Sequence, residues 1–312
     1  MRRAGACAAA CEGVSKEMTG IREKGTKRIQ VPGNASGEPP ESSRVQFRYT
    51  LGVVVLYFSL AFAITWAILI PALAAVPEDR QILFIIPAAF GPFVAAIIAI
   101  RVGRGKAELR RWLGHIFTLR IPVVLTITGA FLLPIGVGAL QYALYRILGG
   151  RPAWSTANPW YLYLAYLIPT ALLTGGNEEP GWRGFALPAL LERFHPVLAS
   201  IILGVIHAAW HLPLMSHYDT SFGWYVFNVL PLTFIFNWLY LRSRGRVIPV
   251  MLFHAGTNVI GDFIPTPTAV LGGLGSGFVL RAIVYWAVAI VLIILTKGRL
   301  GYDSPEVSRA AG

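Results

Sequence analysis

The stretch TLGVVVLYFSLAFAITWAILIPALAAV, residues 50–76, contains no charged side chain. A helix needs about 20 mostly apolar residues to cross a bilayer, and this stretch is longer than that. Similar apolar runs follow it, so the sequence predicts an all-α fold, a polytopic membrane bundle of about eight transmembrane helices. The expected spans are residues 50–76, 82–100, 121–147, 160–177, 197–215, 222–241, 248–263 and 277–296.

The composition of the whole chain also indicates a membrane protein. Of its 312 residues, 55% are hydrophobic and 13% are charged, whereas an average soluble domain has about 25% charged residues. The mean hydropathy is +0.59. On such a chain, the formal charge of +12 indicates basic loops beside an anionic membrane surface. We therefore expect membrane lipid as a partner and no nucleic acid.

Basic residues gather in alternate loops, which predicts the orientation of the chain. Segments 101–120 and 242–246 and the tail after residue 296 are rich in Lys and Arg, whereas 216–221 and 264–275 contain neither. By the positive-inside rule, both termini should lie in the cytoplasm of a multi-pass protein of the cell membrane.

The same pattern suggests how the chain is divided. We expect a disordered basic cytoplasmic tail over residues 1–48, a transmembrane domain over 49–297 and a cytoplasmic tail over 298–312. Residues 105–118 are expected to form an amphipathic helix on the cytoplasmic surface.

Three polar clusters interrupt the later spans, where ionisable groups are costly and usually functional. The first is GGNEEPGWRG, residues 175–184. The second contains His207 and His211, and the third contains His254 and Asn258. The members of each of these two pairs are four residues apart, so they share a helix face. Pro213 should kink the span that carries the second cluster.

In the first cluster, the Gly-Gly pair lets the chain leave regular helix, and Pro180 suits the start of a new one. Glu179 and Arg183 are spaced to pair across one helical turn, which leaves Glu178 without an obvious partner. The three clusters meet only if the chain continues as helix beyond Glu178. We therefore predict that residues 178–192 are largely helical and partly embedded in the membrane.

Glutamate, histidine and asparagine on three separate spans form a ligand set for a divalent metal, with zinc as the candidate. The predicted ligands are His211, His254 and Glu178, and the sequence contains no His-Glu-x-x-His motif. Each cluster alone also suits a structural role, such as a solvated carboxylate pair or an interhelical hydrogen bond.

Together the clusters resemble the motifs of the CPBP family of intramembrane proteases, which contains the CAAX prenyl endopeptidases and bacterial proteins implicated in bacteriocin self-immunity. The family pattern is Glu-Glu-x-x-x-Arg, then Phe-x-x-x-His, then His-x-x-x-Asn or Asp. The first and third motifs match in full. In the second, His211 fills the histidine position, but His207 stands where the family usually has phenylalanine. The role of His207 is open between packing and an extra polar group in the site.

The resemblance implies an intramembrane endopeptidase with a cavity open to the cytosol, acting on a peptide or on a prenylated or other membrane-associated substrate. It assigns catalytic roles to Glu178, Glu179, Arg183, His211, His254 and Asn258. In the roles that the resemblance implies, Glu178 would activate water with the help of His211. His254 and Asn258 would stabilise the oxyanion or help to hold a metal. Glu179 and Arg183 would shape and orient the site. Participation of a metal and catalysis by glutamate and histidine alone both stay open.

Two other functions agree with the same residues. One is a catalytically silent scaffold or immunity protein of the same fold. The other is a proton-coupled transporter, because glutamates and histidines at the membrane midplane also form proton relays. Against a transporter, the sequence contains no paired inverted halves.

Overall fold

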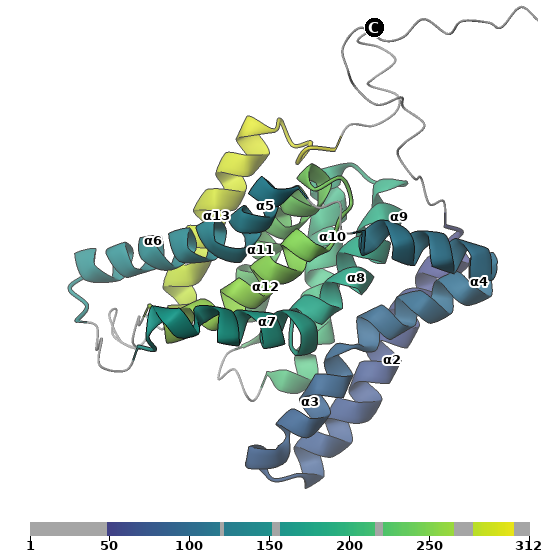
Figure 1. Ribbon diagram of the computed structural model, residues 1–312, viewed down its shortest axis with the longest axis horizontal. Helices are drawn as coiled ribbons and strands as arrows, with labels where there is room; N and C mark the ends of the chain where they lie inside the picture. The colour runs from purple at the N-terminus through teal and green to yellow at the C-terminus, as the bar shows by residue number, and fades with distance from the viewer. Residues whose placement is uncertain (1–48, 119–121, 152–156, 216–220, 265–276, 303–312) are drawn as a thin grey trace, which may run out of the picture. The chain divides into compact units, whose positions relative to one another are not determined.

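The computed structural model describes residues 49–118, 122–151, 157–215, 221–264 and 277–302 (Figure 1). Within these ranges the regular elements are helices and none is a strand, which confirms the all-α prediction. The predicted disordered tail over 1–48 and residues 303–312 lie outside the described residues. The boundaries of the transmembrane domain at 49 and 297 stay predictions.

The first helices of the described chain form a close pair. Helix α2 (Leu51–Ala75) packs along α4 (Gly91–Ile116), and the short α3 (Ile82–Ala89) leads from one to the other. Small side chains let helix backbones approach closely, as is typical of membrane bundles. The fully buried alanines of this pair are Ala61, Ala95, Ala96 and Ala99.

Helix α4 turns back on itself at Gly105, whose φ of 85° is left-handed (Figure 1). The part after the turn is the amphipathic helix predicted over 105–118. Trp112 and Ile116 are buried on one face, whereas Arg110 is exposed on another. Its position on a membrane surface stays a prediction.

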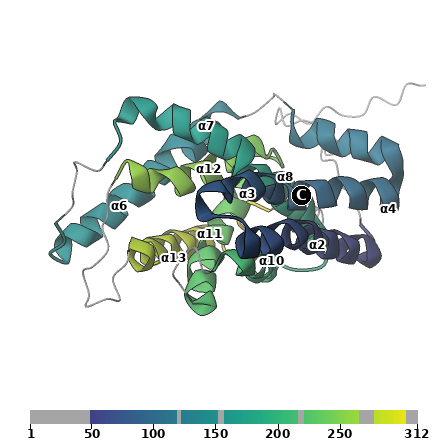
Figure 2. The same cartoon turned by 90° about the horizontal axis from the view of Figure 1, so that it is seen from below.

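Helix α12 (Ile248–Val259) lies inside the bundle (Figure 2). Helix α7 (Tyr163–Leu173) packs on one side of it, and α11 (Phe222–Arg242) followed by α13 (Gly277–Leu295) lies on the other. Because α12 carries the third polar cluster, that cluster is surrounded by other helices.

A continuous helical stretch also passes against α12. It consists of α5 (Val123–Ile127), the π-helix η3 (Thr128–Leu132) and α6 (Leu133–Ile147). Single helical turns connect several elements: η2 (Glu78–Arg80), η5 (Trp160–Leu162) and η9 (Ile260–Asp262).

The predicted helicity of residues 178–192 is confirmed, although the segment consists of four short pieces. They are η6 (Gly176–Glu178), α8 (Glu179–Gly181), the π-helix η7 (Trp182–Ala186) and α9 (Leu187–Leu191). Pro180 lies in the first turn of α8, as its sequence position predicts. All five residues of η7 are buried. The location of this segment within a membrane stays a prediction.

The prediction of a kinked span over 197–215 is wrong. Helix α10 (Pro196–Trp210) ends before Pro213, which lies in the separate 3-10 turn η8 (Leu212–Leu214). A proline inside an α-helix clashes with the preceding turn and removes a hydrogen bond. Here the chain ends the α-helix instead of bending it.

Among the described residues, four helical stretches are long and apolar enough to cross a membrane. They are Leu51–Ala75, Ile82–Ile116, Val123–Ile147 and Phe222–Arg242. The second is longer than the span predicted over 82–100. The predicted spans at 160–177 and 248–263 contain α-helices of only 11 and 12 residues, α7 and α12. The count of eight spans and the cytoplasmic termini stay predictions.

Gly181 provides a test of how closely α8 packs on α4. A Cβ at this position would lie 2.4 Å from the backbone oxygen of Pro92, which has little freedom to move. We expect Gly181→Ala to lower the free energy of unfolding by about 1–3 kcal/mol, measured by thermal unfolding in detergent. The matched control is Gly114→Ala, because a Cβ there meets nothing within 4 Å. Equal effects of the two substitutions would contradict this close packing.

Candidate active site

The chain leaves regular helix at Gly175, as the Gly-Gly pair predicts. Gly175 has a φ of 131°, which residues other than glycine rarely adopt. A Cβ there would lie 2.6 Å from Nδ2 of Asn258 and 3.2 Å from Cδ2 of His254. The backbone therefore approaches α12 closely, and the residues that follow bring both glutamates into the bundle.

Glu178 is buried and hydrogen-bonded. Its Oε2 accepts a hydrogen bond from Nε1 of Trp182 at 3.3 Å and lies 3.1 Å from Nε2 of His207. The expectation that Glu178 lacks a partner is therefore wrong. His207 lies on α10, so the spacing of residues within the first cluster does not reveal this contact.

The centre of the bundle holds a fully buried ion pair, which confirms the predicted pairing across one turn. Nη1 of Arg183 donates to both oxygens of Glu179, each at 3.0 Å, and neither side chain has exposed surface. His254 donates from Nδ1 to Oε1 of the same carboxylate at 2.6 Å. The guanidinium also lies 4.4 Å from the ring centroid of Phe236, and its Nε donates to Oδ1 of Asn237 at 3.3 Å.

His207 and His211 share one face at the end of α10, as their spacing predicts, and both line the cavity described below. Nδ1 of His211 lies 3.0 Å from the backbone oxygen of His207. A carbonyl oxygen only accepts hydrogen bonds, so this nitrogen carries the proton. In the neutral ring the lone pair is then on Nε2, which is the nitrogen that can accept a proton or bind a metal.

Glu178, His207 and His211 place ligand atoms within 4.8 Å of one another, and all three are buried. One carboxylate and two imidazoles are a ligand set of catalytic zinc sites. The set fits a divalent ion. His211 makes the second hydrogen bond usual for metal-bound histidines, and Nδ1 of His207 is buried without a hydrogen-bond partner among the described residues. The predicted ligand set named His254, which lies outside this group and bonds to Glu179.

His254 and Asn258 lie one turn apart on α12. Nδ2 of Asn258 donates to the backbone oxygen of Thr174 at 3.3 Å, which uses one of its two amide hydrogens. This contact fixes the amide beside Gly175, where the chain leaves regular helix. The other amide hydrogen is left for a group inside the cavity.

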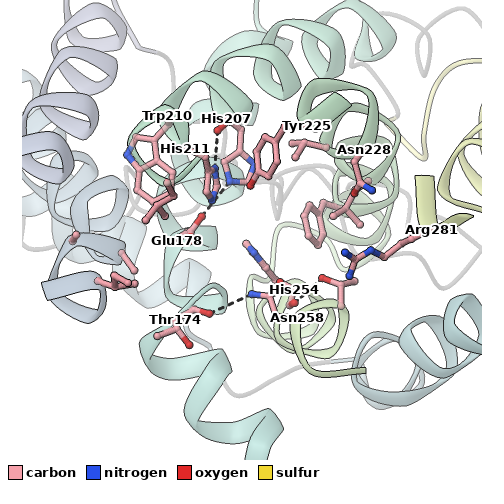
Figure 3. A pocket seen from close by; sticks show the side chains of 18 of the residues that line it. Thr174, Glu178, His207, Trp210, His211, Tyr225, Asn228, His254, Asn258 and Arg281 are labelled. Atoms are coloured by element: carbon pink, nitrogen blue, oxygen red, sulfur yellow. Dashed lines mark hydrogen bonds and ion pairs between the residues drawn. The ribbon is translucent and has the colours of Figure 1, made fainter. Parts of the chain in front are cut away.

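The three clusters meet, as predicted, around one cavity of about 500 Å³ (Figure 3). Glu178, His207 and His211 lie on one side of it, and His254 with Asn258 lies across from them. Glu179 and Arg183 are not part of the lining and support it from behind. Apolar side chains of α2 and α3 also line the cavity: Leu69, Ile85, Ala88 and Ala89.

Several polar lining residues are absent from the predicted set, among them the following four. Arg281 and Tyr285 come from α13, Thr257 from α12 and Asn228 from α11. Arg281 had a signal in the sequence, because it is a charged residue inside a predicted span. The other three are neutral residues of kinds that are common in membrane helices, and no local pattern distinguishes them.

Residues 158–260 match the family model described as Type II CAAX prenyl endopeptidase Rce1-like. The chain is also 25% identical over 223 residues to CAAX prenyl protease 2 of Methanococcus maripaludis, an alignment that covers 65% of this chain and 82% of the relative. The six predicted catalytic residues all fall within the matched range. The comparisons thus agree with the three motifs: residues 158–260 are similar to the Rce1-like type II CAAX prenyl endopeptidases.

Proposed function

We propose that this protein is an intramembrane endopeptidase that hydrolyses a peptide bond in a prenylated or otherwise membrane-associated substrate. The observation that supports this most directly is the convergence of a buried glutamate, three histidines and an asparagine on one cavity. The names of the family model and of the relative agree with peptide-bond hydrolysis.

In this proposal Glu178 is the general base. Its Oε2 is held by Trp182 and His207, whereas Oε1 has no hydrogen bond to any described residue and is free to accept a proton from water. The lone pair on Nε2 of His211 accepts the second hydrogen of the same water. The water oxygen attacks the carbonyl carbon, and Glu178 later passes its proton to the leaving amine as the C–N bond breaks.

His254 and Asn258 are the proposed oxyanion donors. Asn258 offers its remaining amide hydrogen. His254 already donates from Nδ1 to Glu179, so Nε2 donates only when the ring carries a second proton. The carboxylate of Glu179, 2.6 Å from that ring, stabilises the charged form. Glu179 and Arg183 are therefore positioning residues, because they act through His254.

We further propose that the reaction is metal-assisted, with Glu178, His207 and His211 as the ligands. A bound divalent ion would polarise the water and the scissile carbonyl. Nε2 of His211 would then be a ligand and would no longer accept a hydrogen bond from the water. Proton transfer would fall to Oε1 of Glu178, and the oxyanion roles of His254 and Asn258 are unchanged.

The proposed topology is a multi-pass membrane protein with eight spans, both termini in the cytoplasm and the cavity open to the cytosol. It rests on the basic residues of alternate loops and on the four long apolar helices.

The first test removes the general base. Glu178→Gln keeps the shape of the side chain and its contact with Trp182 but cannot accept the proton from water. We expect the rate of cleavage of a farnesylated peptide, followed by mass spectrometry, to fall about 100- to 10,000-fold. Glu78→Gln is the matched control, because Glu78 is exposed in η2. An unchanged rate of cleavage by the Glu178→Gln variant would contradict the proposed mechanism.

The buried ion pair predicts a specific pattern of stability. Glu179→Gln leaves the Arg183 charge without a counter-ion, so we expect the free energy of unfolding to fall by about 3–5 kcal/mol. Glu179→Gln combined with Arg183→Met removes both charges and should regain most of that loss in thermal unfolding. Cleavage should remain low, because a neutral amide stabilises the charged His254 ring less than a carboxylate does. A double variant that is fully active, or as unstable as the single one, argues against this role.

Metal assistance is tested at His207. His207→Phe restores the residue usual in the family and supplies no ligand. We expect stoichiometric divalent metal in the purified wild type by mass spectrometry, and loss of both metal and cleavage in the variant. We also expect a chelator to lower the rate of the wild type. Full cleavage by metal-free protein contradicts metal assistance and leaves water activation to Glu178 and His211.

A further inference from the structure

A line of buried polar groups continues from the ion pair of Glu179 and Arg183 to helix α10. Nε of Arg183 donates to Oδ1 of Asn237 on α11 at 3.3 Å, and Nδ2 of Asn237 donates to the hydroxyl oxygen of Ser200 on α10 at 2.8 Å. That hydroxyl donates to the backbone oxygen of Pro196, also at 2.8 Å. The three linked side chains, Arg183, Asn237 and Ser200, are fully buried and form what we call the polar bridge.

The donors and acceptors of the polar bridge agree with one orientation of the Asn237 amide. Nε of an arginine only donates, so the amide oxygen faces Arg183. The amide nitrogen then faces Ser200, whose oxygen accepts its hydrogen, and the Ser200 hydroxyl keeps its own hydrogen for the carbonyl of Pro196. Each printed contact therefore satisfies a group that would be costly to bury without a partner.

The polar bridge joins the two helices that carry the proposed catalytic groups. At one end, Glu179 is bonded to His254 of α12 as well as to Arg183. At the other end, Ser200 lies seven residues before His207 on α10, and positions seven apart share a helix face. Neither Asn237 nor Ser200 lines the cavity. The bridge thus connects the helix of the oxyanion donors to the helix of the water-activating histidines from behind the site.

We propose that Asn237 and Ser200 are positioning residues, which hold Arg183 in place and fix α10 relative to α12. This inference rests on the proposed endopeptidase function and adds two residues that lie outside the three motifs. Because neither residue can touch a substrate in the cavity, both act through other groups. Their loss should therefore lower kcat and leave KM nearly unchanged.

The surroundings of Arg183 explain why it needs Asn237. The ring of Phe236 lies 4.4 Å from the guanidinium carbon and attracts the charge, but a ring face offers no single acceptor that fixes the direction of the N–H groups. The hydrogen bond from Nε to Asn237 supplies that direction. Nη1 then stays between both oxygens of Glu179, and this carboxylate stays 2.6 Å from Nδ1 of His254.

The test changes the polar bridge in the middle and at its far end. Asn237→Leu has a similar volume but no polar atom, so Nε of Arg183 loses its acceptor. Ser200→Ala keeps that acceptor and removes only the anchor on α10. For cleavage of a farnesylated peptide by the full-length protein, we expect kcat to fall about 10- to 100-fold in Asn237→Leu and about 3- to 10-fold in Ser200→Ala. Ser200→Ala is the milder change and keeps the test valid if Asn237→Leu does not fold.

Thr233→Val is the matched control. Thr233 lies one turn before Asn237 on α11, is fully buried and faces α10 beside Gly204, but its hydroxyl donates to Val229 of its own helix. This substitution changes the same helix interface without touching the polar bridge, so kcat should stay within about twofold of wild type. A loss of kcat as large as that of Asn237→Leu would overturn the proposal. So would bridge variants that raise KM and leave kcat unchanged.

A double-mutant cycle asks whether Asn237 acts through the ion pair. The background carries Glu179→Gln and Arg183→Met, which removes both charges. Asn237→Leu should lower kcat by less than about twofold in this background, because the carboxylate that it helps to position is already absent. The same fold loss as in the wild type would overturn the positioning role, because it would show that Asn237 acts independently of Arg183.

NMR of the histidine rings separates this inference from the proposed function, because it needs no cleavage. In protein labelled with 15N at histidine, the ring shifts of His254 report on its hydrogen bond to Glu179. Asn237→Leu should move these shifts, whereas Thr233→Val should not. Moved shifts together with a wild type that cleaves no peptide contradict the proposed function alone. Unmoved shifts overturn the positioning role whether or not cleavage occurs.

Discussion

The carboxylate of Glu179 is the interaction on which the rest of the site depends. It accepts hydrogen bonds from Arg183 and His254, and Arg183 also contacts α11 through Asn237 and Phe236. Transfer of two charges from water into the interior costs several kcal/mol per ion, which is offset only by good geometry and further hydrogen bonds. Because these partners come from α11 and α12, residues 176–191 have one favourable way to dock against both helices.

This constraint explains why the backbone around the site is irregular. Consecutive residues of a regular α-helix point about 100° apart, yet Glu178 must reach α10 while Glu179 reaches α12. The 3-10 turn η6, the short α8 and the π-helix η7 adjust these directions residue by residue. π-Helical turns such as η7 are frequently found at functional sites. Within a membrane protein they are tolerated where the backbone is buried in protein or lines a cavity, as it does here.

The parts of the site that the sequence predicts are those fixed by local spacing. The pairing of Glu179 with Arg183 follows from four-residue spacing alone, and so do the shared faces of the other two clusters. The contact of Glu178 with His207 joins two elements, and the place of Arg281 depends on how α13 packs. Two predicted spans differ from the observed helices in length for another reason. Hydropathy measures how apolar a run is, whereas α7 ends before Gly175 and α12 ends at Val259, so their apolar runs exceed their helices.

Two of the histidines that line the cavity have fixed orientations, which favours catalysis over the alternatives. Nδ1 of His211 is bonded to a backbone oxygen and Nδ1 of His254 to a carboxylate, and these contacts fix the orientation of each ring. A proton-coupled carrier needs groups that exchange partners during its cycle. Donors and acceptors fixed in advance stabilise the charge that develops in a transition state without reorganisation. A catalytically silent scaffold needs no such fixed donors and acceptors. It does not need the buried ion pair either, because apolar residues can replace such a pair with no loss of stability. This chain keeps the buried Glu179–Arg183 pair and the fixed rings of His211 and His254. Catalysis is the function that best accounts for the free-energy cost of burying these polar groups.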